Sequence, residues 1–285
     1  MAPRLFVFVQ LEFPWVLGLA GGRYLMRSRS GGDPEHVVVV EAERPREDAS
    51  GAGETGIMVI DPVSLSAEHQ AQAWLQDVFR DPGRAVSETM EVVNRVVYLH
   101  RLAAADPHVH ELAATQAAAA RAGWGEGEQL AEGRWSHARE LPLSGAAKRR
   151  FLRRPSKRER TEELSHVEHL AALLGARELP LVCEELALRA RLDLDSGRSA
   201  HAALELHQAL ATALAELRGE ARQDLVLRVD ELEQLSGGVR REAERILESA
   251  EHGPPGEEDT GPDGELLAHA LGRLESALRA RKLRV

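Results

Sequence analysis

Histidines close to acidic residues are the first groups in this sequence whose types and spacing could do chemistry. His166 and His169 are three residues apart, so on a helix they share one face, with Glu162 and Glu163 one turn earlier. That spacing could hold zinc or take part in a site with two metal ions. The sequence designates no third ligand, so we interpret the two histidines as weak candidates on a solvated face and expect no metal and no cofactor.

Nucleophilic catalysis finds no support in the sequence. The chain has one cysteine, Cys183, which excludes an internal disulfide, and Glu184 and Glu185 follow it directly. Neighbouring carboxylates raise the pKa of a thiol, which disfavours the nucleophilic thiolate. No Gly-x-Ser-x-Gly elbow is present either. We therefore interpret Cys183 as a core residue, and the sequence favours a protein that is not an enzyme.

A group of polar residues gathers near the end of one predicted helix and in the turn that follows it. These residues could line a polar pocket, or they could form a hydrogen-bonded corner between helices. The group consists of Asn94, Arg95, Tyr98, Arg101, Asp106 and His108.

The segment 143–160 is the strongest electrostatic feature and is predicted to be a basic hinge. The segment holds eight basic residues and one acidic residue, Glu159. The basic residues are Lys148, Arg149, Arg150, Arg153, Arg154, Lys157, Arg158 and Arg160. The hinge could bind nucleic acid, an anionic membrane surface or an acidic protein. Alternatively, it is a tether that neutralises the acidic segment that follows it.

The elements before this hinge predict an α+β domain over 1–142, with a mostly antiparallel sheet. Four short apolar runs are typical of strands: Leu5–Phe13, Arg23–Ser28, His36–Glu41 and Gly56–Asp61. The second run could pair with the first as a hairpin or a longer excursion.

The pattern changes to a helical period after the fourth strand. One helix is predicted after Ser66, a second over 85–105, and a third that begins at Asp106-Pro107 and stops at Gly123. A last hairpin is predicted over 128–140.

After the hinge the sequence predicts an all-α helical-hairpin domain over 161–251. Glycines at 175, 197, 219 and 237 are expected to end successive helices, and a further helix reaches about residue 251. The polar, glycine- and proline-rich segment 252–264 is predicted to be a flexible linker, and 265–285 a C-terminal helix.

One internal match suggests a repeat within the helical domain. A Gly-Ala-Leu-Ala pattern occurs at 197, 202, 206 and 209 and again, 41 residues later, at 238, 243, 247 and 250. This pattern resembles one or two tetratricopeptide-repeat units, although their period is 34 residues. The resemblance implies a stack of helical hairpins, and a plain antiparallel bundle is the alternative.

Composition sets the broad class of the protein. The chain has 285 residues, of which 43% are apolar and 29% charged, and its formal net charge is −10. These values are typical of a soluble protein of about two domains. Glu12 interrupts the first apolar run and no apolar window approaches the length of a spanning helix, so we expect a cytoplasmic protein without a transmembrane segment.

The basic residues indicate the kind of organism from which the protein comes, since only Lys148, Lys157 and Lys282 are lysines and the rest are arginines. Such a bias toward arginine, together with the segment 127–135, resembles uncharacterised proteins of GC-rich bacteria. No activity follows from that resemblance.

Three functional hypotheses remain open from the sequence. The first is a non-enzymatic adaptor that binds an unidentified protein partner through its helical C-terminal half. The second is a small-molecule-binding or catalytic N-terminal domain with a regulatory helical half. The third is a binder of anionic surfaces or nucleic acid through 148–160. The oligomeric state is left open.

Overall fold

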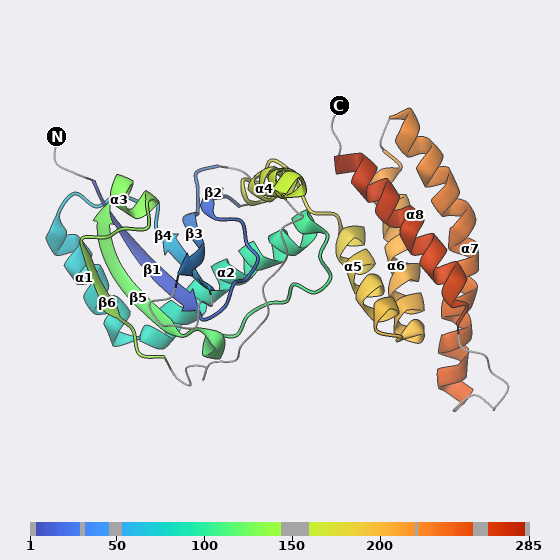
Figure 1. Cartoon of the computed structure of the whole chain (residues 1–285), viewed down its shortest axis with the longest axis horizontal. Coiled ribbons are helices and arrows are strands. Elements are labelled where there is room, and N and C mark those ends of the chain that lie inside the picture. Colours follow the sequence, from blue (N-terminus) through green and yellow to red (C-terminus); the bar gives the residue numbers. More distant parts are fainter. Residues whose placement is uncertain are drawn as a thin grey trace. The chain divides into compact units, whose positions relative to one another are not determined.

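The computed structural model describes residues 4–28, 32–45, 53–143, 160–219, 222–252 and 262–282. Their contacts divide the chain into two compact units, which Figure 1 shows. The first unit comprises Met1–Ala104 with Val109–Leu179, and the second comprises Ala105–His108 with Pro180–Val285. The first contains an antiparallel sheet with helices and the second is all helical, so the predicted fold class is confirmed.

The described strands of the first unit form one six-stranded sheet in the order β2-β3-β4-β1-β5-β6. Their bounds are β1 (Leu5–Phe13), β2 (Gly22–Met26), β3 (His36–Pro45), β4 (Gly53–Ile60), β5 (Ala119–Glu126) and β6 (His137–Glu140). Every pair of neighbours is antiparallel. The possible pairing of β2 with β1 does not occur, because β4 and β5 lie on the two sides of β1 and β2 pairs with β3 at the sheet edge.

The central strand β1 is buried on both faces, which explains why its sequence is nearly continuous in apolar residues. Phe8 packs with Met58 and Leu130 on one face of the sheet. Val7 and Val9 alternate with Phe8 and so point to the opposite face. Helices α1 (Glu68–Arg80) and α2 (Pro82–Ala104) contact β1 there.

Helix α4 (Arg160–Leu174) lies with the first unit. It packs against α2 and β2, and the backbone N–H of Arg27 donates to the carbonyl oxygen of Leu174 at 3.0 Å. The sequence assigns 161–174 to the helical-hairpin domain instead. The difference arises because the buried Leu170 and Leu174 pack against apolar residues of the first unit. The boundary between the two units therefore follows Leu179.

The predictions for 106–140 are wrong in two places. The expected helix up to Gly123 is replaced by a short 3₁₀ turn, η1 (Ala114–Gln116), and by strand β5. The expected hairpin over 128–140 is instead helix α3 (Gly127–Ala131) followed by β6. Alanine favours a helix, but pairing with β1 on one side and β6 on the other outweighs that local preference.

The second unit packs its described helices around one apolar core. They are α5 (Val182–Asp195), α6 (Ser199–Leu217), α7 (Gln223–His252) and α8 (Gly264–Lys282). The core is built from leucine and alanine, including Leu206, Leu232 and Leu274. The Arg191 guanidinium donates to both carboxylate oxygens of Glu275, at 2.8 and 3.0 Å, and so joins α5 to α8.

Helix α7 is continuous through Gly237 and Gly238, so the predicted stop at Gly237 is wrong. Val239 and Ala243 are buried and continue the apolar stripe of the helix, and this packing outweighs the low helix propensity of two glycines. Gly197, by contrast, lies in a turn with a φ of +73° between α5 and α6. The two glycines of the 41-residue match therefore have different backbone roles.

Segments that carry two further predictions lie outside the described residues. The basic hinge falls almost entirely on 144–159, and most of the expected linker falls on 253–261. Separately, none of the described helices combines the length and the apolar character needed to cross a membrane.

Substitution of Gly237 and Gly197 by alanine should have opposite effects on stability. Gly237→Ala should raise the free energy of unfolding by about 0.5–1 kcal/mol, because alanine favours a helix interior and its Cβ would meet only the Arg241 side chain at 3.8 Å. Gly197→Ala should lower it by about 1–2 kcal/mol, because alanine is strained at a positive φ. Urea unfolding followed by circular dichroism measures both. Destabilisation by Gly237→Ala as well would indicate a turn at that position and contradict a continuous α7.

Candidate functional site

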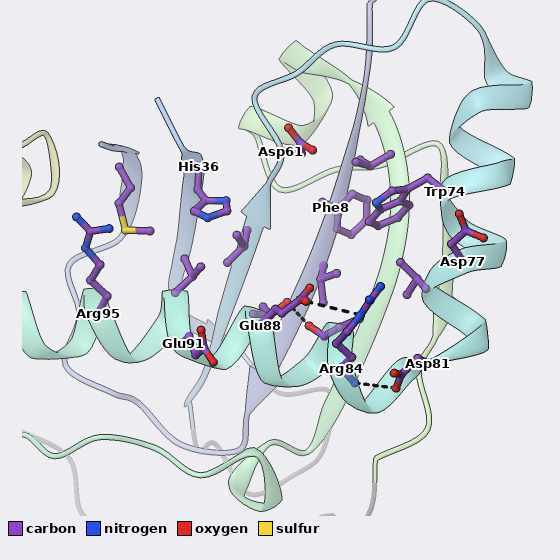
Figure 2. A pocket seen from close by; sticks show the side chains of 18 residues that line it. Phe8, His36, Asp61, Trp74, Asp77, Asp81, Arg84, Glu88, Glu91 and Arg95 are labelled. Carbon is purple, nitrogen blue, oxygen red and sulfur yellow. Dashed lines mark hydrogen bonds and ion pairs between the residues drawn. The ribbon is translucent and has the colours of Figure 1, made fainter. Parts of the chain in front are cut away.

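A groove of about 740 Å³ lies in the first unit, between α1, α2 and the sheet. Its floor lies at one end of the sheet, where β1 and β3 begin. Because the strands are antiparallel, β2 and β4 end at the same place. Figure 2 shows α1 and α2 as the two walls, with side chains of both helices around the space between them.

The corner between the two walls depends on a single residue, Asp81. Helix α1 ends at Arg80 and α2 begins at Pro82, so Asp81 alone connects them. Its carboxylate accepts a hydrogen bond from the backbone N–H of Arg84 at 3.1 Å, which caps α2, and proline is favourable at the first position of a helix. Two helices that share such a corner diverge across the sheet, and the groove occupies the space between them.

The floor of the groove is apolar. Val7, Val9 and Val59 lie on adjacent strands and are less than a tenth exposed. Met26 extends this floor onto β2, and Trp74 of α1 is half-buried in the wall. An apolar floor of this kind can bind the hydrocarbon part of a ligand and exclude water.

Charged residues form the rim of the groove, and acids exceed bases among them. The lining contains two arginines, Arg84 and Arg95. It contains five carboxylates: Asp61, Asp77, Asp81, Glu88 and Glu91.

Both arginines of the rim already have acidic partners. Arg84 Nε lies 3.6 Å from Glu88 Oε1. Arg95 pairs with Glu35 at 3.1 Å and donates to the carbonyl oxygen of Arg27 at 2.7 Å. Their side chains are therefore held by the protein, and the net charge of the rim is negative.

His36 lies at the start of β3, on the inner side of the groove (Figure 2). Burial lowers the pKa of His36 below its ordinary value. The carboxylates of Glu35 and Asp61 act in the opposite direction, and Arg95 adds to the lowering. His36 is therefore neutral at pH 7 and does not offset the negative charge of the rim.

The polar pocket predicted around the end of α2 is not assembled as one site. Asn94 instead clamps the chain after α2: its amide donates to the carbonyl oxygen of Leu112 at 2.9 Å and accepts from the N–H of Leu112 at 2.8 Å. The carboxylate of Asp106 accepts from the N–H of His108 at 2.8 Å in a local turn that belongs to the second unit. Tyr98 and Arg101 lie farther along α2 and do not line the groove, which leaves Arg95 as its one member from that group.

The candidate metal ligands His166 and His169 both lie on α4, half-buried. His169 Nε2 is 3.4 Å from a carboxylate oxygen of Glu178. No group of three or more potential ligands that could hold a metal ion occurs among the described residues. Among the described residues, the structure therefore places one acid, Glu178, beside His169 and completes no metal site with His166.

Cys183 is fully buried in the core of the second unit. Burial raises the pKa of its thiol, and a hydrogen bond with Glu216 raises it further. The same carboxylate accepts the backbone N–H groups of Val182 and Cys183 at 2.9 and 3.1 Å and so caps α5. This environment disfavours a thiolate and fits a core cysteine.

The charged residues that α2 contributes to the groove are regularly spaced in the sequence, although no known motif contains them. Arg84, Glu88, Glu91 and Arg95 are spaced four, three and four residues apart, so they lie on one face of α2, beside the buried face that carries Val86, Met90, Val93 and Val97. A charged stripe usually marks a solvated helix face. Here the sheet lies close to the charged stripe of α2, and the stripe therefore forms the rim of a groove.

No protein-family description matches the chain, and neither the curated proteins nor the solved structures yield a match. The groove is therefore the feature of this chain that bears on its function.

The stability of the wild type relative to a His36→Gln variant should depend on pH. Because the folded chain lowers the pKa of His36, the unfolded chain binds a proton more readily in acid. The stability of the wild type relative to the variant should therefore be constant above about pH 7 and fall as the pH is lowered from about 7 toward 5. Urea unfolding of both proteins at several pH values tests this. A difference that does not change with pH would contradict a half-buried, neutral His36.

Removal of the Asn94 clamp should destabilise the first unit. Asn94→Ala removes two hydrogen bonds to Leu112, so the free energy of unfolding should fall by about 1–3 kcal/mol. Thermal and urea unfolding measure the loss. Unchanged stability would mean that the clamp does not hold the chain after α2.

Proposed function

We propose that the first unit is a binding domain for a small organic molecule, which occupies the groove between α1, α2 and the sheet. The observation that carries this proposal is a space of about 740 Å³ with an apolar floor and a charged rim. Ligand sites typically measure about 300–1,000 Å³ and combine mostly apolar walls with a few polar groups. The groove fits that description in size, and its floor supplies the apolar surface, whereas its rim is more strongly charged.

Among the described residues, the groups that line the groove disfavour nucleophilic catalysis by a hydroxyl or a thiol. The one hydroxyl among the described lining residues, on Thr89, donates to the carbonyl oxygen of Ala85 at 2.7 Å and so belongs to the hydrogen bonding of α2. The cysteine of the chain lies in the second unit. The remaining polar groups are suited to orienting and attracting a ligand.

The adaptor hypothesis for the helical half stays a prediction. Exposed apolar side chains of the second unit include Leu227 and Leu247. They are twenty positions apart on α7, a separation of about 30 Å along a helix, and so do not form one patch. The polyanion hypothesis depends on 148–160, whose side chains are outside the described residues.

Filling the groove should abolish ligand binding without unfolding the protein. Val92 lines the groove from α2 and is only half-buried, so Val92→Trp should occupy the space with little effect on the core. A fragment screen by amide NMR should give shifts centred on the groove in the wild type and lose them in this variant.

The matched control for that screen is Leu25→Trp. Leu25 is 50% exposed on β2 and precedes Met26 of the groove floor, so its side chain points to the other face of the sheet. This variant should keep the shifts. Fragments that bind Val92→Trp as well as the wild type would contradict a ligand site in the groove.

A further inference from the structure

We propose that the ligand of this groove is an organic cation: a primary ammonium or guanidinium group carried on an apolar or aromatic body. The inference rests on the proposed function and names the chemical class that the site selects. It follows from the charges of the rim, the state of His36 and the presence of Trp74.

The rim has carboxylates that no arginine neutralises. Asp61 Oδ1 accepts the backbone N–H of Val63 at 2.8 Å, and Asp81 Oδ1 accepts that of Arg84. Each of these hydrogen bonds uses one oxygen. Neither carboxylate forms an ion pair with any residue that the structure describes, so both keep an oxygen for a ligand.

The apolar floor strengthens the effect of these charges inside the groove. Carboxylates above a low-dielectric surface concentrate their field in the space between, which raises the local concentration of cations. The half-buried, neutral His36 adds no opposing charge. An anionic ligand would meet net repulsion at the same place.

Trp74 supplies a second feature that favours a cation. Its indole lies in the α1 wall beside Asp77 (Figure 2). The Asp77 carboxylate is already paired with Arg80 at 2.6 Å, so the carboxylates assigned to a cation are Asp61 and Asp81. An ammonium or guanidinium group over an indole face is attracted by the ring electrons, and a flat aromatic ligand can stack on the same surface. Carboxylates together with an indole therefore match a cation on an aromatic body.

The test uses three probes that share one ring system and a two-carbon chain. Tryptamine ends in an ammonium group, indole-3-ethanol in a hydroxyl, and indole-3-propionate in a carboxylate. Isothermal titration of the full chain at neutral pH should show that tryptamine binds at least tenfold more tightly than either of the others. Its affinity should also fall when the salt is raised from about 0.1 to 1 M, because ions screen the exposed rim.

Two substitutions separate the charge of the rim from its structure. Asp61→Asn and Asp81→Asn each remove a negative charge but keep an oxygen for the backbone hydrogen bond, and asparagine caps a helix as well as aspartate does. Each should weaken tryptamine binding about threefold, and both together about tenfold. Asp106→Asn is the matched control, because Asp106 makes the same kind of local bond outside the groove, and it should leave the affinity unchanged.

The outcomes distinguish the class of ligand from the site itself. If indole-3-ethanol or indole-3-propionate binds as tightly as tryptamine, and Val92→Trp abolishes that binding, the cation selectivity is wrong and the groove remains the site. If the Asp61→Asn and Asp81→Asn variants bind tryptamine like the wild type, the assigned carboxylates are wrong. If none of the three probes binds, this inference is overturned, whereas the proposed function is overturned only by the fragment screen with Val92→Trp.

Discussion

The single-residue connection at Asp81 is the constraint on which the candidate site depends. A longer loop would allow α1 and α2 to lie side by side and cover the sheet, whereas one residue makes them share a corner and diverge. The carboxylate of Asp81 caps α2 and Pro82 begins it, so the corner is fixed by the sequence at that point. The groove is therefore a consequence of backbone geometry, and its walls are regular helices.

The same corner links the architecture of the groove to its charge. Asp81 is both the cap of α2 and one of the rim carboxylates, and the charged face of α2 continues the rim toward Arg95. At the far end, the ion pair between Arg95 and Glu35 holds α2 to the chain just before β3. Residues that secure the helices thus also set the electrostatics of the space between them.

Sequence periodicity identified most of the elements but not the site. Strand β1 and helices α2, α5 and α6 were predicted because their apolar periods are strong and their ends carry turn or capping residues. Strand β5 and the continuous α7 were missed, because tertiary packing outweighs the local preferences of alanine and of glycine there. The groove collects residues from both helices and four strands, so no local pattern reveals it.

A crystal structure of the full chain with bound tryptamine tests the central claim most directly. We predict that the indole lies against the floor formed by Val7, Val9 and Val59, with the ammonium nitrogen within hydrogen-bonding distance of the Asp61 or Asp81 carboxylate. Tryptamine bound only elsewhere on the protein would contradict it. A crystal structure in which α1 and α2 close together and leave no groove would contradict it as well.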